Sequence, residues 1–203
     1  PTNSNYTKWL ESPWFIMGVF FVLIAPFSLN FHFHYPDEMY YTDASIQMLK
    51  NGDYFTTYLG NGELRFKKPI LTYWAVLAGF QIFGISPFSS RVVFLLFGTC
   101  LVGLTYWIAK TASNDRKIAS SAAWILACQP LVIFSSSRAI PDILLVCFLT
   151  LSAVGVTGML KNPNTPSKRH LWLFYIGLGL GFAVKGLPDF ALGAISFLYI
   201  AAN

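Results

Sequence analysis

"ILTYWAVLAGFQIFG", residues 70–84, is the stretch that decides how this chain folds. It is long enough for a helix but shorter than the roughly 20 residues that a helix needs to cross a bilayer. Pro69 suits the first turn of such a helix, and Gly84 suits its end. Its large apolar side chains fall on one stripe, which is typical of a helix lying in the membrane interface: Ile70, Tyr73, Trp74, Leu77 and Phe80.

The composition shows why a membrane matters here. Of the 203 residues, 55% are hydrophobic and only 11% are charged, whereas a soluble domain carries about a quarter charged residues. We therefore predict an all-α, polytopic membrane protein. No stripe rich in Lys and Arg with interleaved aromatic residues occurs in the sequence, which argues against nucleic-acid binding. Three cysteines lie in apolar runs without CxxC spacing and are expected to be buried free thiols: Cys100, Cys128 and Cys147.

The apolar runs predict the membrane spans. Five runs and a sixth after a short break are candidates: 14–31, 92–109, 119–136, 143–160, 171–184 and 189–202. If 70–84 lies flat, the basic loops 110–118 and 161–170 share one side with Lys8, and the positive-inside rule makes that side cytoplasmic. If 70–84 spans, the rule fails. We therefore predict that it lies flat.

On this topology the outer side receives the first outer loop, 32–91, together with the turns 137–142 and 185–189. Seven of the nine acidic residues lie there: Asp37, Glu38, Asp43, Asp53, Glu63, Asp142 and Asp189. A loop this long is expected to have its own structure and function.

Inside this loop, Pro36 is expected at the first position of a helix that Asn51-Gly52 ends, and a turn is expected at Asn61-Gly62. The apolar stripe of that helix is predicted to be Tyr41, Ala44, Met48 and Leu49. Glu63 and Arg65 are expected to pair.

Three Pro-Asp pairs, at 36–37, 141–142 and 188–189, each open an apolar helix on this side. Taken singly, each aspartate is explained by the helix N-terminus, which stabilises a carboxylate by about 0.3–1 kcal/mol. Their convergence with basic residues on one membrane face favours chemistry on a phosphorylated lipid, in which a carboxylate activates an acceptor and cations hold the phosphate. The candidate catalytic residues are Asp37, Glu38 and Asp142, and the candidate phosphate-binding residues are Lys68, Arg91, Arg138 and Lys185.

The stretch "PDEMYYTDASIQMLKNGDYFTTYLGNGELRFKKPILTYW" resembles the first outer loop of the lipid A aminoarabinose transferases. The resemblance continues through "FGISPFSSR", "SRAIPD" and "GLGLGFAVKG", and covers nearly all of 36–190. That family shares the GT-C membrane glycosyltransferase fold with the protein O-mannosyltransferases. Its chains run well beyond this length, so residues 1–203 are expected to be the N-terminal part of such a domain.

The resemblance implies roles for four residues. Asp37 is similar to the family's principal catalytic carboxylate and Asp142 to its second outer-loop aspartate, while Lys68 and Lys185 resemble lysines that contact the donor phosphate. The family's glutamate before the "KP" lysine resembles a metal ligand, but Lys67 stands at that place here, which puts a divalent metal in doubt.

The histidines and one arginine at the membrane edge each allow more than one role. His32 and His34 are explained as interfacial side chains better than as metal ligands, since no third ligand is in view. Arg91 is expected either to anchor a span by snorkelling or to lie near the lipid phosphate.

The sequence thus predicts a multi-pass inner-membrane enzyme that transfers a sugar from a polyprenyl phosphate, on the periplasmic side, to a lipid A-like or other acceptor. The alternatives are a protein O-glycosyltransferase of the same fold and a non-enzymatic lipid-sugar transporter. A transporter is expected to show inverted repeats and ionisable residues near the bilayer midplane, which the sequence lacks.

Overall fold

The structure is a computed structural model that describes residues 8–29, 36–161, 167–186, 195 and 198. Within these residues it is built of helices, with one isolated β-bridge between Tyr58 and Leu64. The helices are α2 (Pro13–Ser28), α3 (Asp37–Asn51), α4 (Leu71–Phe83), α5 (Pro87–Ser113), α6 (Arg116–Ala127), α7 (Pro130–Ser136), α8 (Pro141–Lys161) and α9 (Lys168–Lys185). The all-α prediction is confirmed.

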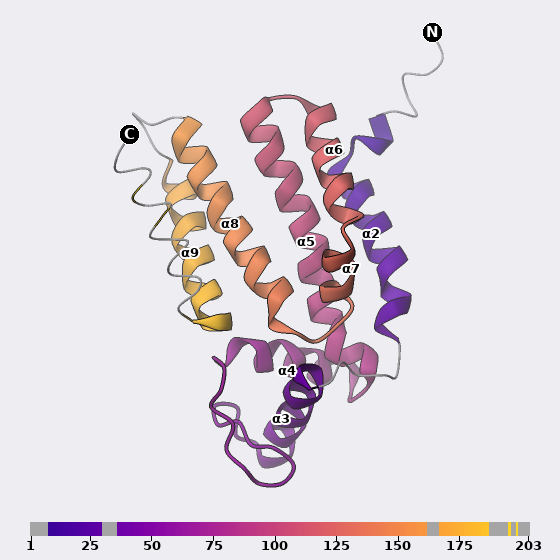
Figure 1. The fold of residues 1–203 in the computed structure, drawn as a ribbon, viewed down its shortest axis with the longest axis vertical. Helices are drawn as coiled ribbons and strands as arrows, with labels where there is room; N and C mark the ends of the chain where they lie inside the picture. The colour runs from indigo at the N-terminus through magenta and orange to yellow at the C-terminus, as the bar shows by residue number, and fades with distance from the viewer. Residues whose placement is uncertain (1–7, 30–35, 162–166, 187–194, 196–197, 199–203) are drawn as a thin grey trace.

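Helices α2, α5, α6, α8 and α9 form the bundle, and they lie alongside one another in Figure 1. Among the described residues, α5 and α8 are each long and apolar enough to cross a membrane. Helices α6 and α7 supply a third span if they are counted as one broken span, bent by 66°. The five predicted runs up to 184 thus coincide with helices, whereas the sixth falls almost wholly outside the described residues.

The bend between α6 and α7 corrects the prediction of one continuous helix over 119–136. Pro130 lies at the start of α7, where its missing N–H costs nothing. Inside a longer helix the same ring would clash with a preceding carbonyl and remove a hydrogen bond. The apolar run therefore contains a break that hydrophobicity alone does not reveal.

Helix α4 lies across one end of the bundle, as predicted for 70–84 (Figure 1). It is more than an interfacial helix, because Tyr73, Leu77 and Phe80 are buried between α3 and the bundle. Its approach to α5 is very close: a Cβ at Gly79 would overlap the carbonyl of Ser89. Only glycine permits this contact, which fixes α4 against the start of α5.

The two ends of the bundle differ in charge and are called the loop end and the basic end. The loop end carries α3, α4, the turn 137–140 and the last turn of α9. The basic end carries the start of α2, the α5–α6 connection, the last turn of α8 and the first turn of α9. Lys110, Arg116, Lys117, Lys161, Lys168 and Arg169 therefore share the basic end, as the flat placement of 70–84 requires.

The first outer loop folds largely as predicted. Helix α3 ends at Gly52, whose left-handed φ of 68° suits glycine. Three of the four predicted stripe residues are buried, and Leu49 is partly buried. Gly62, with φ 83°, makes the turn that pairs Tyr58 with Leu64.

Two details of the sequence interpretation were wrong. No ion pair joins Glu63 to Arg65 in this part of the described chain; the Arg65 guanidinium is instead buried and stacks 3.8 Å from the centroid of the Tyr40 ring. The three cysteines are free, but only Cys147 is buried within the chain, while Cys100 and Cys128 are exposed on the bundle surface.

The arrangement of the ends predicts a labelling pattern. In a variant without native cysteines, single cysteines at exposed positions 63 and 67 should react with a membrane-impermeant reagent added outside. Cysteines at positions 117 and 168, also exposed, should react only after the membrane is permeabilised. Outside labelling at 117 would show that the topology is wrong.

Candidate functional site

The loop end brings together polar residues that are far apart in the sequence. Asp37 lies in the first turn of α3, Asp142 in the first turn of α8, and Lys185 in the last turn of α9. Each position also suits its helix electrostatically, because carboxylates are favoured at helix N-termini and cations at C-termini. Their convergence requires tertiary packing, which the helices supply.

Antiparallel packing of α8 on α9 sets Asp142 beside Lys185. A Cβ at Gly177 would lie 2.6 Å from the amide nitrogen of Ser152, so the two backbones approach too closely for any larger residue. Small residues permit such close helix pairs in membranes. The start of α8 is thereby held next to the end of α9.

Asp142 and Lys185 form an ion pair that is open to solvent. Lys185 Nζ lies 2.6 Å from Asp142 Oδ1, and their side chains are 31% and 50% exposed. Both line a cavity of about 360 Å³, together with Ser135 and apolar residues of α5, α7 and α8. This is a charged, accessible pair at the mouth of an apolar cavity, an arrangement suited to a lipid phosphate.

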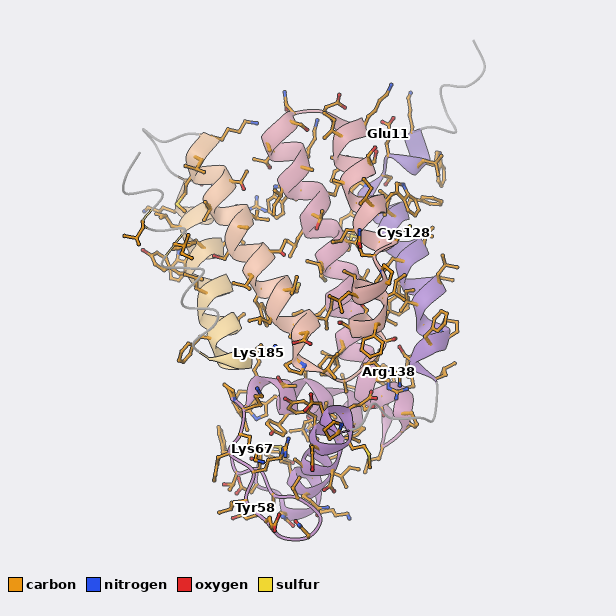
Figure 2. All side chains as sticks on the ribbon, in the orientation of Figure 1. Glu11, Tyr58, Lys67, Cys128, Arg138 and Lys185 are labelled. Atoms are coloured by element: carbon orange, nitrogen blue, oxygen red, sulfur yellow. The ribbon has the colours of Figure 1, made fainter. Side chains whose placement is uncertain are left out.

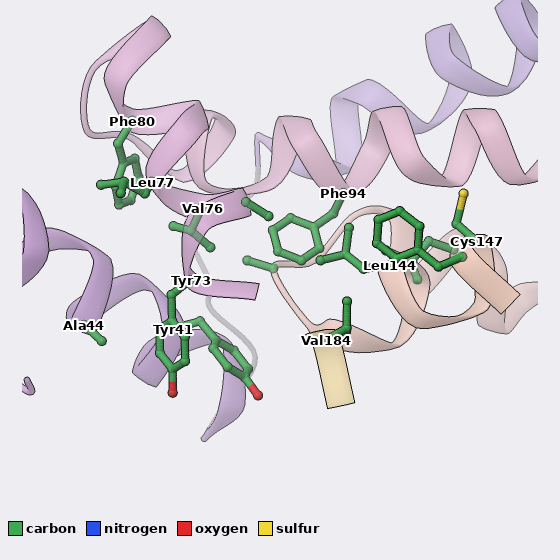
Figure 3. Packing of buried hydrophobic residues seen from close by; sticks show 14 of the residues in the cluster. Tyr41, Ala44, Tyr73, Val76, Leu77, Phe80, Phe94, Leu144, Cys147 and Val184 are labelled. Atoms are coloured by element: carbon green, nitrogen blue, oxygen red, sulfur yellow. The ribbon is translucent and has the colours of Figure 1, made fainter. Parts of the chain in front are cut away.

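Tyr41 links this pair to Asp37. Its ring packs edge-on to Tyr73, with centroids 5.1 Å apart, and both hydroxyls point away from the apolar side chains around Phe94 and Leu144 (Figure 3). Burial raises the pKa of Tyr41, and the charges of Asp37 and Asp142 raise it further. Both carboxylates therefore lie within electrostatic reach of one phenol.

Asp37 itself is exposed, and the N-cap of α3, Pro36, makes no side-chain capping hydrogen bond. Two other loop carboxylates are used to fold the loop. Asp43 accepts a hydrogen bond from the amide of Gly60 at 2.8 Å, and Asp53 accepts two from the amides that follow it. Asp37 is thus the exposed carboxylate of the α3 N-terminus.

Glu38, the neighbour of Asp37, is fully buried. It accepts hydrogen bonds from Arg91 Nε at 2.5 Å and Arg91 Nη2 at 3.1 Å, and from the Ala139 amide at 2.9 Å. Arg138 Nη1 lies 3.6 Å from Glu38 Oε2. One carboxylate therefore joins α3 to the start of α5 and to the α7–α8 turn.

Arg91 is also fully buried, and its Nη1 donates to the carbonyl of Ser28 at the end of α2. Both expected roles, snorkelling and phosphate binding, need an accessible guanidinium. In this structure the side chain instead holds α2, α3 and α5 together. Arg138 is 20% exposed and lies at the loop end (Figure 2).

Lys67 and Lys68 are both exposed on the segment that enters α4. Trp74 of α4 holds the preceding part of the loop, since its indole N–H donates to the carbonyl of Tyr54 at 2.7 Å. Lys67 precedes α4 in the sequence and lies in the loop on the side of α4 away from the bundle, whereas Lys185 lies at the end of the bundle (Figure 2). Contact of Lys68 with a phosphate stays a prediction.

The profile of the family described as "Dolichyl-phosphate-mannose-protein mannosyltransferase" matches residues 11–202. The chain belongs to this family.

Named relatives agree with that membership. Over 201 residues the chain is 30% identical to the undecaprenyl phosphate-alpha-4-amino-4-deoxy-L-arabinose arabinosyl transferase 1 of Proteus mirabilis, covering 97% of this chain and 35% of the relative. The chain thus spans about a third of the length of the curated relatives it matches.

The fold is also that of solved family structures. The apo crystal structure of ArnT from Cupriavidus metallidurans matches with a TM-score of 0.78 at 19% identity, covering 98% of this chain and 41% of ArnT. ArnT bound to undecaprenyl phosphate matches with a TM-score of 0.75 at 20% identity, covering 92% and 39%. The GT-C transmembrane architecture is therefore shown.

The residues that the structure describes offer no cluster that fits a metal ion. No group of three His, Cys, Asp or Glu side chains with metal-binding geometry occurs among the described residues. Lys67 occupies the place of the expected glutamate, and a protonated amine cannot ligate. His32, His34 and Asp189 lie outside the described residues, so their predicted roles stay as stated.

Sequence reasoning did not foresee the Glu38 cluster or the influence of two carboxylates on the pKa of Tyr41. Glu38 looked like a second catalytic acid, and Tyr41 looked like one apolar stripe residue. A signal existed for Glu38: at position 2 of an amphipathic helix it shares a face with the buried Tyr41, Thr42 and Ser45.

Proposed function

We propose that this chain is the N-terminal part of a membrane glycosyltransferase that moves a sugar from a polyprenyl phosphate to an acceptor on the extracytoplasmic side of the inner membrane. The proposal rests on one observation above all. An exposed aspartate, Asp37, and an accessible Asp142–Lys185 pair lie at the loop end, and Tyr41 lies within electrostatic reach of both carboxylates.

The comparisons support the donor class. A relative over nearly the whole chain is named an undecaprenyl phosphate-aminoarabinose transferase, and ArnT has been crystallised with undecaprenyl phosphate. We infer a polyprenyl-phosphate sugar as donor and a lipid A-like molecule as acceptor. The family description, which names a protein mannosyltransferase, supports the alternative of a protein acceptor.

In the proposed reaction, an acceptor oxygen attacks the anomeric carbon of the sugar while the bond from that carbon to the phosphate oxygen breaks. Asp37 receives the acceptor proton, and the electron pair of the broken bond goes to the departing polyprenyl phosphate. Attack from the face opposite the leaving group inverts the anomeric configuration. General-base assistance of this kind contributes about 10²–10⁴-fold.

The departing phosphate needs positive charge. Lys185 supplies it at the mouth of the cavity, and Asp142, 2.6 Å away, holds the ammonium in place. Lys68 and Arg138 are proposed to add charge from the loop and from the α7–α8 turn. Cations aimed at a leaving phosphate stabilise charge that develops in the transition state.

We assign Glu38 and Arg91 a positioning role in place of direct catalysis. Their buried pair fixes the first turn of α3, and therefore Asp37, against α5 and the α7–α8 turn that precedes Asp142. A catalytic group must be held in place by rigid supports of this kind.

The activity is tested with the full-length protein in membranes. Labelled polyprenyl-phosphate sugars are incubated with membrane extract, and the labelled product is identified. Label in a glycolipid supports lipid transfer, label in protein supports the alternative acceptor, and label that remains on the donor contradicts the proposal. Movement of intact donor across the membrane without transfer would support the transporter.

Metal dependence gives a further prediction. Because Lys67 replaces the expected ligand and no described cluster can hold a metal, transfer should survive EDTA largely unchanged. Relatives with glutamate at that place serve as the matched control and should lose more activity. Complete loss here, restored by a divalent ion, would contradict this assignment.

A further inference from the structure

A large apolar groove lies on the bundle away from the proposed reaction site. It has a volume of about 700 Å³ and is lined by residues of α2, α5, α8 and α9, among them Met17, Leu104, Trp107, Phe148 and Leu151. Along α5 it extends from Phe97 to Lys110, which at 1.5 Å per residue is about 20 Å. The groove is therefore long, and it reaches the basic end.

Two cations line the basic end of this groove. Lys110 comes from the last turn of α5 and Arg169 from the first turn of α9, and both line the groove. The Arg169 guanidinium stacks 4.9 Å from the centroid of the Trp107 ring, and Lys110 Nζ donates to the carbonyl of Asn114 at 2.8 Å. Both side chains are thus held at the groove by their own contacts.

We propose that this groove binds an anionic phospholipid from the leaflet at the basic end. An acyl chain lies along α5 between Leu104 and Phe148, and the headgroup phosphate lies between Lys110 and Arg169. Basic pockets between transmembrane helices on the cytoplasmic side suit anionic headgroups. An acyl chain is as apolar as the groove wall and as long as the groove.

Charge decides between a lipid and a further helix of the same protein as occupant. A helix filling the groove would have to supply its own carboxylate opposite Lys110 and Arg169, because burying cations without a counter-charge is costly. A phosphate headgroup supplies that charge and leaves the cations at the membrane surface. The assignment is independent of the proposed reaction, because it uses other residues at the opposite end of the bundle.

Lipid binding is tested on the delipidated full-length protein by native mass spectrometry with phosphatidylglycerol and phosphatidylethanolamine. We expect phosphatidylglycerol to bind more tightly, by about tenfold or more for two cations near one anionic headgroup. The double variant Lys110→Gln/Arg169→Gln should lose this preference. The control Lys117→Gln/Lys168→Gln removes the same charge from the same end, outside the groove, and should keep it.

Equal binding of the two lipids, or equal loss in both double variants, would overturn the proposal. A photoreactive residue at position 151 identifies the occupant directly in the otherwise unchanged protein, so that the answer does not depend on whether the charge variants fold. An adduct with a phospholipid supports the proposal. An adduct only with another segment of the same protein, or no adduct, contradicts it.

Discussion

Asp37→Asn is expected to lower the turnover of sugar transfer by at least about 100-fold while the protein still accumulates in the membrane. Asparagine keeps the size and hydrogen bonding of the side chain but cannot accept a proton. If Asp37 served only the helix N-terminus, asparagine would replace it at a cost below about 1 kcal/mol and activity would change little. Initial rates of transfer at matched protein levels measure the difference.

Asp53→Asn is the matched control. Asp53 accepts two backbone hydrogen bonds in a turn of the same loop, and asparagine can accept them too. Its activity should stay near normal. Near-normal transfer by Asp37→Asn, or an equal loss in both variants, would show that Asp37 is not the base.

Glu38→Gln is expected to destabilise the protein by about 3–5 kcal/mol, because it leaves the buried Arg91 without its carboxylate partner. The loss should appear as a lower free energy of unfolding in mixed detergent micelles. Adding Arg91→Gln should recover part of it, since the uncompensated charge is then removed as well.

Glu63→Gln, on an exposed glutamate of the same loop, should change stability little and is the control. Comparing the two variants distinguishes a positioning role of Glu38 from a catalytic one. A Glu38→Gln variant of unchanged stability that has lost its activity would identify Glu38 as a catalytic group and contradict the positioning role.

The sequence predicted the helices better than their contacts. Hydrophobic runs mark the bundle helices, and the charge of the loops between them is enough to lay 70–84 across its end. The break at Pro130 was missed because no charged residue interrupts 119–136, and a proline at the start of a new helix is indistinguishable by hydrophobicity from one inside a long helix.

The candidate site was likewise predictable only in part from the sequence. Asp37, Asp142 and Lys185 stand at helix ends that topology places on one face, so their convergence could be expected. Glu38 and Arg91 are 53 residues apart, and nothing in either local pattern shows that one neutralises the other. The effect of the Asp37 and Asp142 charges on Tyr41 likewise depends on tertiary packing, in which α3 packs on α4.

The central claim is that the loop end receives a polyprenyl phosphate, and the affinity of the full-length protein for undecaprenyl phosphate and for undecaprenol tests it most directly. We predict that the native protein binds the phosphate more tightly than the alcohol. Lys185→Gln should remove most of that preference, and the control Lys117→Gln should keep it. Equal affinity for both lipids in the native protein, or an undiminished phosphate preference in Lys185→Gln, would contradict the account.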